Sequence, residues 1–229
     1  MYRLTKVFSM LIAGVDEAGR GPVIGPLVIA GVSLDEKDLP KLVDLGVKDS
    51  KLLSPQRRET LSSQIKKLAL NYHIVLLSPA EIDRVVESKR KLHKLNRLEA
   101  QAMARVIEVL KPDVVYVDAS DVLADRFGEH IAENLSFGPK IISEHKADIK
   151  YPVVSAASII AKVERDKVIS QLQKKHGNMG CGYPSDSNTI KFLEDWIRNF
   201  GAYPDFVRKS WKTAKRVKSE ADSRQKKLQ

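Results

Sequence analysis

Acidic residues follow three apolar runs of the chain, and each run has the character of a strand. The acids are Asp16 with Glu17, Asp118 and Asp148. In an open α/β sheet, ligands bind beyond the carboxyl ends of the strands. Four carboxylates gathered there would repel one another unless cations neutralised them, and oxygen ligands of this kind suit Mg²⁺ or Mn²⁺. Two such ions, about 3.5–4 Å apart, can activate a water molecule and stabilise the leaving oxygen of a phosphodiester.

A plainer interpretation of these acids stays open at this point. A carboxylate at a strand end can simply cap the strand or carry a loop charge, and for any single acid that explanation is favoured. Its weight falls when acids recur at three separate strand ends. The spacing alone does not decide between a metal site and ordinary surface charge.

The elements that must position these acids are of two kinds. Short runs rich in Val and Ile, bounded by Gly and Pro, predict strands at 11–15, 27–34, 74–77, 114–117 and from 141 onward. The first two are joined by a Gly/Pro-rich connection, so we expect them to pair. Helical periodicity and caps predict helices from Ser54-Pro55, from the Ser78–Glu81 capping box, and within 92–110, 154–168 and 189–200. Strands alternating with helices are typical of α/β or α+β folds.

The chain is basic, and its charge is concentrated near the C-terminal end. The 229 residues include 39 Lys and Arg against 29 Asp and Glu, a formal net charge of +10. Residues 208–229 hold nine basic and two acidic residues, which is +7 of that total. Such a segment is either an arm that contacts phosphates or a solvated helix end or tail. It lacks sustained apolar periodicity after Trp211, so we expect it to be dispensable for the core.

Composition narrows the class of protein further. Hydrophobic residues make up 43 % and charged residues 30 % of the chain, ordinary values for a globular protein with its own core. Cys181 is the only cysteine, which excludes an intramolecular disulfide and a Cys-based zinc cage and fits a reducing, cytoplasmic compartment. The best apolar run, residues 23–32, contains Gly25 and Pro26 and falls short of the ~20 residues that a membrane span needs.

Six ordered motifs carry a resemblance to a known family. The first, Asp-Glu-Ala-Gly-Arg-Gly at 16–21, resembles the signature of type 2 ribonucleases H, the ribonuclease HII family. The others match in family order and lie at 48–54, 117–119, 145–148, 156–162 and 182–186. The resemblance covers about residues 11 to 211, and the Gly-Tyr-Pro-Ser-Asp segment makes it archaeal-like. A lone Gly-Arg-Gly would be weak evidence, but six motifs in order are strong evidence.

The resemblance implies a ribonuclease H-like fold of class α/β, a mixed sheet flanked by helices, with a C-terminal helical extension. We expect the catalytic domain to cover 1–168 and the extension, with its basic tail, 169–229. The resemblance also implies a metal-dependent endonuclease that hydrolyses RNA in RNA–DNA hybrids and at single ribonucleotides embedded in duplex DNA. The family cuts on the 5′ side of the ribonucleotide and leaves 5′-phosphate and 3′-hydroxyl ends, a chemistry used in DNA replication and repair.

The family's site residues carry over one by one. Asp16, Glu17, Asp118 and Asp148 match its catalytic, metal-binding carboxylates, with Mg²⁺ or Mn²⁺ in a two-metal site. The candidates for substrate binding are Gly19, Arg20, Gly21, Lys51, Lys162 and Tyr183. His145 could help to move protons, but a structural histidine is the favoured interpretation.

Each substrate-binding candidate has a physical reason. Gly19 and Gly21 lack Cβ, so their backbone can approach a sugar closely, and backbone groups can sense a 2′-OH. Tyr183 sits among Gly and Pro and could stack on a sugar or base; the matching family tyrosine reads the RNA-to-DNA junction. The three basic candidates could contact phosphates, although a solvated surface charge is the usual role of a single Lys.

Two alternatives compete with this assignment. One is a two-metal nuclease of the same fold that does not discriminate a 2′-OH. The other is a non-catalytic nucleic-acid-binding module, which would have no need for acids at three strand ends. We expect a monomer with no membrane partner. Some archaeal relatives end in a sliding-clamp motif; here Gln225 and Leu228 keep its spacing, but its aromatics are absent, so the support for clamp binding is weak.

Overall fold

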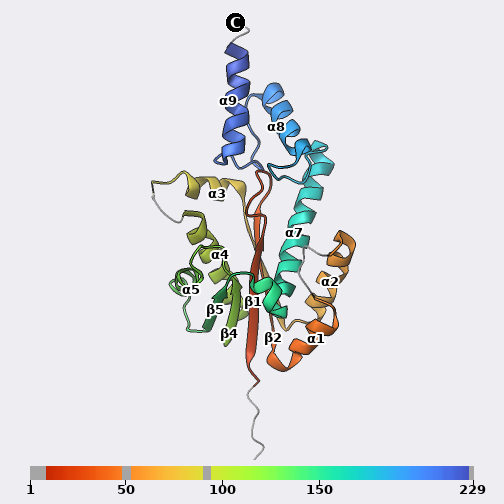
Figure 1. Ribbon diagram of the computed structural model, residues 1–229, viewed down its shortest axis with the longest axis vertical. Helices are drawn as coiled ribbons and strands as arrows, with labels where there is room; N and C mark the ends of the chain where they lie inside the picture. The colour runs from red at the N-terminus through yellow and green to blue at the C-terminus, as the bar shows by residue number, and fades with distance from the viewer. Residues whose placement is uncertain (1–8, 48–52, 90–93, 227–229) are drawn as a thin grey trace, which may run out of the picture. The chain divides into compact units, whose positions relative to one another are not determined.

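The computed structural model describes residues 9–47, 53–89 and 94–226 (Figure 1). Its strands are β1 (Leu11–Ala18), β2 (Leu27–Asp35), β3 (Asn71–Leu77), β4 (Val114–Asp118) and β5 (Lys140–Glu144). Its helices are a short 3-10 helix, η1 (Glu36–Asp38), and α1 (Leu39–Asp44), α2 (Pro55–Leu68), α3 (Pro79–Val86), α4 (Lys94–Leu110), α5 (Ala124–Ala132), α6 (Ala147–Lys150), α7 (Pro152–His176), α8 (Ser187–Phe200) and α9 (Lys212–Lys226). Every strand and helix predicted from the sequence is present, and α7 extends beyond both predicted ends.

The strands form one five-stranded sheet in the order β3-β2-β1-β4-β5. β1 pairs with β4 and β4 with β5, both in parallel. β1 and β2 are neighbours joined by residues 19–26, a connection too short for a parallel crossover, so this pair is antiparallel and the sheet is mixed. The predicted pairing of the first two strands is confirmed.

The chain divides into two compact units. The first comprises Met1–Asp16, Ile29–Val75 and Ala100–Ala161, and the second comprises Glu17–Val28, Leu76–Glu99 and Lys162–Gln229. β1, β2, β3, α4 and α7 each contribute residues to both units. The domain boundary at residue 168 stays a prediction.

In the first unit, the start of α7 packs directly on β1. A Cβ built on Gly14 would lie 2.3 Å from the carbonyl carbon of Val153, so only glycine allows this approach. β1 and the first turns of α7 carry fully buried apolar side chains, among them Val15, Val154 and Ala157. Glycine at this one position therefore lets α7 begin beside the strand that carries Asp16.

In the second unit, an apolar cluster joins the C-terminal helices to the loop after β1. Its fully or nearly fully buried members are Val23, Ile24, Ile169, Met179, Leu193, Ile197, Tyr203, Phe206, Val207, Ala214 and Val217. Ala214 and Val217 belong to α9, so the expectation that the segment after Trp211 is dispensable for the core is wrong. Ala214, Val217 and the partly buried Ala221 are spaced three and four residues apart, which gives α9 a narrow apolar stripe on a strongly basic helix.

Two helix starts form as their sequence caps predict. The Ser54 side chain accepts the N–H of Arg57 at the start of α2, with Pro55 in the first position. At α3, Ser78 accepts the N–H of Glu81, and the Glu81 side chain in turn accepts the N–H of Ser78, which completes the capping box. Within the described residues, no helix has the length and apolar character to cross a membrane.

Candidate active site

Three of the predicted carboxylates gather in the first unit. Asp16, Asp118 and Asp148 each offer one oxygen, and these oxygens all lie within 4.8 Å of one another. Asp16 and Asp148 are about 95 % buried, while Asp118 is half-buried. Glu17, the next residue along β1, is not among the three acids that cluster in the described part of the chain.

The sheet itself brings Asp16 and Asp118 together. β1 and β4 are parallel neighbours, and Val15 is the register partner of Val117. The next residue on each strand is therefore one of the two aspartates, at the same level of the sheet. Asp118 is the last residue of β4, so this part of the site follows from strand pairing alone.

Asp148 reaches the cluster by a different route from the one the sequence suggests. It does not end a strand, because β5 finishes at Glu144 and Asp148 lies on the four-residue helix α6. Before α6, Lys146 adopts the left-handed region with φ 57°. The N–H of Ala147 then donates to Oδ1 of Asp118 at 2.8 Å, which ties the Asp148 segment to the end of β4.

The acid that does end β5 is already partnered. Glu144 accepts from the ammonium of Lys150 and, at 2.8 Å, from the hydroxyl of Tyr151. The Lys150 hydrogen bond and then that of Tyr151 hold the pKa of Glu144 below its ordinary value. Glu144 therefore has the partners of a structural carboxylate and lies outside the acidic cluster.

Charge makes the cluster suited to a cation. Three carboxylates with oxygens this close repel one another when all of them are ionised. A hard divalent ion removes the repulsion and takes carboxylate oxygens as ligands. The residues present thus fit Mg²⁺ or Mn²⁺ by charge, atom type and proximity.

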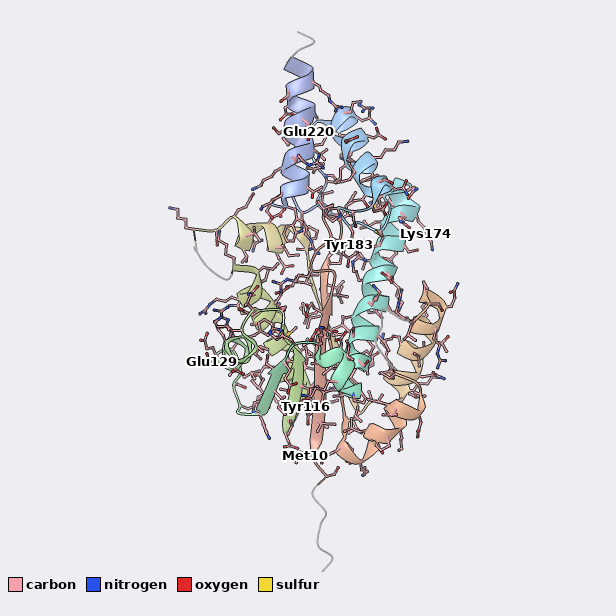
Figure 2. All side chains as sticks on the ribbon, in the orientation of Figure 1. Met10, Tyr116, Glu129, Lys174, Tyr183 and Glu220 are labelled. Carbon is pink, nitrogen blue, oxygen red and sulfur yellow. The ribbon has the colours of Figure 1, made fainter. Side chains whose placement is uncertain are left out.

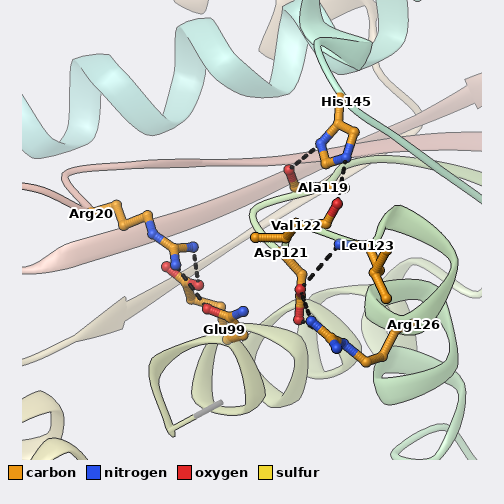
Figure 3. A network of polar contacts seen from close by, with 9 residues as sticks. Arg20, Glu99, Ala119, Asp121, Val122, Leu123, Arg126 and His145 are labelled. Carbon is orange, nitrogen blue, oxygen red and sulfur yellow. Dashed lines mark hydrogen bonds and ion pairs between the residues drawn. The ribbon is translucent and has the colours of Figure 1, made fainter. Parts of the chain in front are cut away.

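The ring of His145 contacts the loop that follows β4. Its Nδ1 lies 3.3 Å from the carbonyl oxygen of Ala119 and its Nε2 lies 3.2 Å from that of Val122 (Figure 3). In the same loop, the buried Asp121 accepts from the guanidinium of Arg126 and from the N–H of Leu123. Both ring nitrogens of His145 thus contact backbone oxygens, which supports the structural interpretation.

In the second unit, the predicted glycine segment has a constrained shape. Gly19 has φ +90°, and a Cβ there would lie 2.8 Å from the carbonyl oxygen of Pro26. A Cβ on Gly21 would instead meet the ring of Tyr183 at 3.6 Å, an ordinary contact. Gly19 is therefore needed for the backbone conformation, and Gly21 faces the aromatic ring that the sequence assigns to substrate binding.

The guanidinium of Arg20 is held by Glu99 and Asn96, two residues that the sequence did not predict. Its guanidinium pairs with the carboxylate of Glu99 at 2.5 Å and donates to the Asn96 side chain at 2.8 Å (Figure 3). The Glu99 side chain is fully buried, while that of Arg20 is 35 % exposed. An acid between Leu98 and Ala102 on the apolar face of a predicted helix is the signal that could have revealed Glu99.

Tyr183 lies in the loop between α7 and α8 (Figure 2). Asp186 accepts the N–H of Cys181 at 2.6 Å and caps α8 by accepting that of Asn188. The guanidinium of Arg165 donates to the Cys181 carbonyl at 2.8 Å and lies 5.1 Å from the centroid of the Tyr183 ring. The loop is thus tied at both ends of the Tyr183 turn.

The hydrogen bonds of Asp186 lower its pKa. The backbone hydrogen bond from Cys181 is the main cause, and those from Asn188 and Thr189 add to it.

Two lysines remain among the residues predicted to bind substrate. Lys162 is a half-buried residue of α7, and Lys51 falls outside the described residues.

Comparison with known proteins gives one consistent family. The family model for Ribonuclease HII matches residues 13–214. A ribonuclease HII from Thermococcus sibiricus is 51 % identical over 213 residues, covering 92 % of this chain and 92 % of the relative. The crystal structure of the ribonuclease H2 from Pyrococcus horikoshii OT3 superposes with a TM-score of 0.86 at 45 % identity, covering 93 % of this chain and 99 % of the other.

A second similar structure is a complex with a partner protein. The ribonuclease HII of the PCNA:RNase HII complex from Archaeoglobus fulgidus is 44 % identical, with a TM-score of 0.81 and coverage of 90 % of this chain and 96 % of the other. These matches confirm the ribonuclease H-like mixed fold and exclude the non-catalytic binding module. The chain belongs to the archaeal-like ribonuclease HII family and is a ribonuclease H.

Proposed function

We propose that this enzyme hydrolyses the RNA strand of RNA–DNA hybrids and also cuts at single ribonucleotides embedded in duplex DNA. It cuts on the 5′ side of the ribonucleotide and leaves 5′-phosphate and 3′-hydroxyl ends, in the service of DNA replication and repair. The observation that carries the proposal is the cluster of Asp16, Asp118 and Asp148, whose oxygens lie within 4.8 Å of one another.

Asp16, Asp118 and Asp148, together with Glu17, are the residues that would hold the divalent ions. When bound, two Mg²⁺ or Mn²⁺ ions supply an activated water and stabilise the leaving oxygen of the phosphodiester. The chain's own contribution is to fix its carboxylates in advance. The register of β1 against β4 sets Asp16 and Asp118 level, and the Ala147 N–H orients Asp118. Little rearrangement is then needed when the ions enter.

Recognition of the ribonucleotide is assigned to the Gly19–Gly21 segment and Tyr183. A Cβ on Gly21 would lie 3.6 Å from the ring of Tyr183, so the ring and the Gly21 backbone are close neighbours. Backbone at such a position can approach a 2′-OH, and the aromatic ring can stack on the adjoining sugar or base. Arg20 supplies positive charge for a phosphate, held in place by Glu99.

Three duplexes of one sequence test the proposal, each incubated with Mg²⁺, Mn²⁺ or a chelator. One contains a single ribonucleotide, one is a full RNA–DNA hybrid, and one is all DNA. We expect metal-dependent cleavage of the first two and none of the third. Cleavage of the all-DNA duplex at a similar rate would instead support a nuclease without 2′-OH discrimination.

A sliding clamp is a partner suggested by the complex from Archaeoglobus fulgidus. In this chain Gln225 and Leu228 keep the spacing of a clamp-binding motif without its aromatics. We propose clamp binding by this tail as a second function, supported by the spacing of Gln225 and Leu228 and by the archaeal complex. Size-exclusion chromatography of the enzyme with a purified PCNA ring, for the native chain and Leu228→Ala, tests this proposal. We expect a complex that Leu228→Ala weakens; no complex, or a complex unaffected by the substitution, would contradict clamp binding by this tail. The single cysteine is consistent with a cytoplasmic location.

A further inference from the structure

A fully buried arginine holds the backbone of the predicted ribonucleotide-binding segment. Arg208, in the connection between α8 and α9, donates from Nη2 to the carbonyl of Gly19 at 2.6 Å and from Nη1 to that of Arg20 at 2.9 Å. Its Nε donates to the carbonyl of Gly25 at 3.1 Å. One side chain, about 190 residues away in sequence, thus fixes three carbonyls of the loop between β1 and β2.

Trp211 adds a fourth carbonyl to this arrangement. Its indole Nε1 donates to the carbonyl of Gly21 at 3.2 Å. The guanidinium of Arg208 lies over the same indole ring, 4.9 Å from its centroid. The carbonyls of three consecutive residues, Gly19 to Gly21, are therefore all engaged by side chains of the segment 208–211.

The segment 208–211 is itself anchored at a separate point. Asp83, on α3, accepts the N–H groups of Lys209 and Ser210 at 2.8 and 3.0 Å and the Ser210 hydroxyl at 2.5 Å. The Arg208 N–H donates to the carbonyl of Val23 at 2.8 Å. The segment 208–211 is therefore fixed by its own hydrogen bonds to Asp83 and Val23. A segment fixed in this way can hold the backbone of Gly19 to Gly21 in place.

Arg208 carries its positive charge in a fully buried position. Burial, and then the nearby Arg165, lower the pKa of Arg208 to about 10, so it remains protonated at neutral pH. A buried charge is costly unless its donors are satisfied, and here backbone carbonyl dipoles satisfy them. Arg208 thus hydrogen-bonds Gly19 in a backbone conformation, φ +90°, that glycine adopts readily and other residues adopt rarely.

We infer that Arg208 and Trp211 are positioning residues for ribonucleotide recognition: they fix the Gly19–Gly21 backbone in its binding conformation before the substrate arrives. The inference rests on the proposed function of that segment. Preorganising a recognition loop raises affinity by removing the cost of ordering it upon binding. The benefit should appear for a duplex that contains a ribonucleotide and be smaller for a duplex that offers no 2′-OH.

The test compares two affinities for each variant. With metal removed by a chelator, the Kd is measured for a duplex holding one ribonucleotide and for the all-DNA duplex of the same sequence. Their ratio does not depend on the fraction of folded protein. The variants are Trp211→Phe, which keeps a ring and removes the indole N–H, and Arg208→Lys. The matched control is Tyr203→Phe, which removes another buried hydrogen bond of this unit, from the Tyr203 hydroxyl to the Ala214 carbonyl.

We expect the preference for the ribonucleotide duplex, which is the ratio of the two Kd values, to fall by about threefold in Trp211→Phe, because the net free-energy contribution of one hydrogen bond is lost. In Arg208→Lys the preference should fall further. Tyr203→Phe should keep the native ratio even where thermal unfolding shows a similar loss of stability. An unchanged ratio in Trp211→Phe would overturn the inference whatever Arg208→Lys does. If the native enzyme itself shows no preference, the recognition function proposed for the segment fails, which is a distinguishable result.

Discussion

At the scale of single residues, Gly19 and Gly21 look equivalent in the sequence but differ in the structure. Gly19 has φ +90° and no room for a Cβ, whereas Gly21 has room for a methyl group beside Tyr183. Sequence reasoning gave both the same role, because a Gly-x-Gly pattern does not say which glycine serves conformation and which serves access. The two positions can be separated by experiment.

Alanine substitutions should give opposite outcomes at these positions. Gly19→Ala forces a side chain into an unfavourable conformation and should lower the free energy of unfolding by about 1–3 kcal/mol. Gly21→Ala should leave it within about 0.5 kcal/mol but raise KM for a one-ribonucleotide duplex, since the methyl group obstructs the approach of the sugar. Urea unfolding and steady-state kinetics measure both. A Gly21→Ala enzyme with native KM would show that the substrate does not approach this backbone.

Other residues of the site could not be predicted because their partners are remote in the chain. Glu99 and Asn96 lie more than 70 residues from Arg20, and Arg208 lies 189 residues from Gly19. No periodicity or motif spacing encodes such contacts. Asp16, Glu17 and Asp118 were accessible to sequence reasoning because they stand at the ends of recognisable apolar runs, whereas Asp148 lies beyond the end of β5 and is identified by the family motif at 145–148.

At the scale of elements, the strands and capped helices were predictable, and the short helix α6 was not. The sequence placed Asp148 at a strand end, but Lys146 takes a left-handed conformation that begins α6 instead. Non-glycine residues rarely adopt that conformation, so nothing in the local sequence announces it. Tertiary contact with Asp118 through the Ala147 N–H accompanies it.

The Tyr183 loop should lose stability in acid. The folded-state pKa of Asp186 lies below its ordinary value of 3.8, mainly through the Cys181 N–H, so its contribution is present above pH 3.8 and is lost as the pH falls through the folded-state pKa. Native protein should therefore be more stable than Asp186→Asn in urea unfolding at pH 7, with a smaller difference near pH 3. If the difference in unfolding free energy between the native protein and Asp186→Asn did not change with pH, it would come from the shape of the side chain and not from its charge.

Truncation is not a suitable way to test whether the basic residues of α9 contact phosphates. Removing residues 213–229 would take Ala214 and Val217 out of the core cluster, so loss of binding would be uninterpretable. Lys212 and Lys218 are exposed on α9. If they contact phosphates, replacing both by Ala should reduce the slope of log affinity against log salt by about 0.9 per contact.

The matched control for that test is Lys37→Ala with Lys41→Ala, which changes net charge equally in the first unit. The control should keep the native salt slope. Equal salt slopes for the native enzyme, the α9 double variant and the control would show that these lysines of α9 are solvated and do not contact phosphates.

At the scale of the whole molecule, the acidic cluster should make stability depend on divalent ions. In chelator, Asp16→Asn relieves repulsion among the three carboxylates and should raise the unfolding free energy by roughly 1 kcal/mol. Adding Mg²⁺ or Mn²⁺ at about 100 times Kd should stabilise the native enzyme by about 2.7 kcal/mol and the variant much less. Thermal unfolding in a metal titration measures both effects, and a native midpoint indifferent to either ion would argue against the metal site.

The most direct test of the central claim is to map the cut in a duplex that holds one ribonucleotide. It uses the native enzyme, Asp118→Asn, and Glu144→Gln as a control with the same charge change at the neighbouring strand end outside the cluster. We predict a single metal-dependent cut on the 5′ side of the ribonucleotide, with 5′-phosphate and 3′-hydroxyl ends. Asp118→Asn should lose at least ~10²-fold of the rate while remaining folded, and Glu144→Gln should keep it. Near-native turnover by Asp118→Asn, or cuts unrelated to the ribonucleotide, would contradict the account.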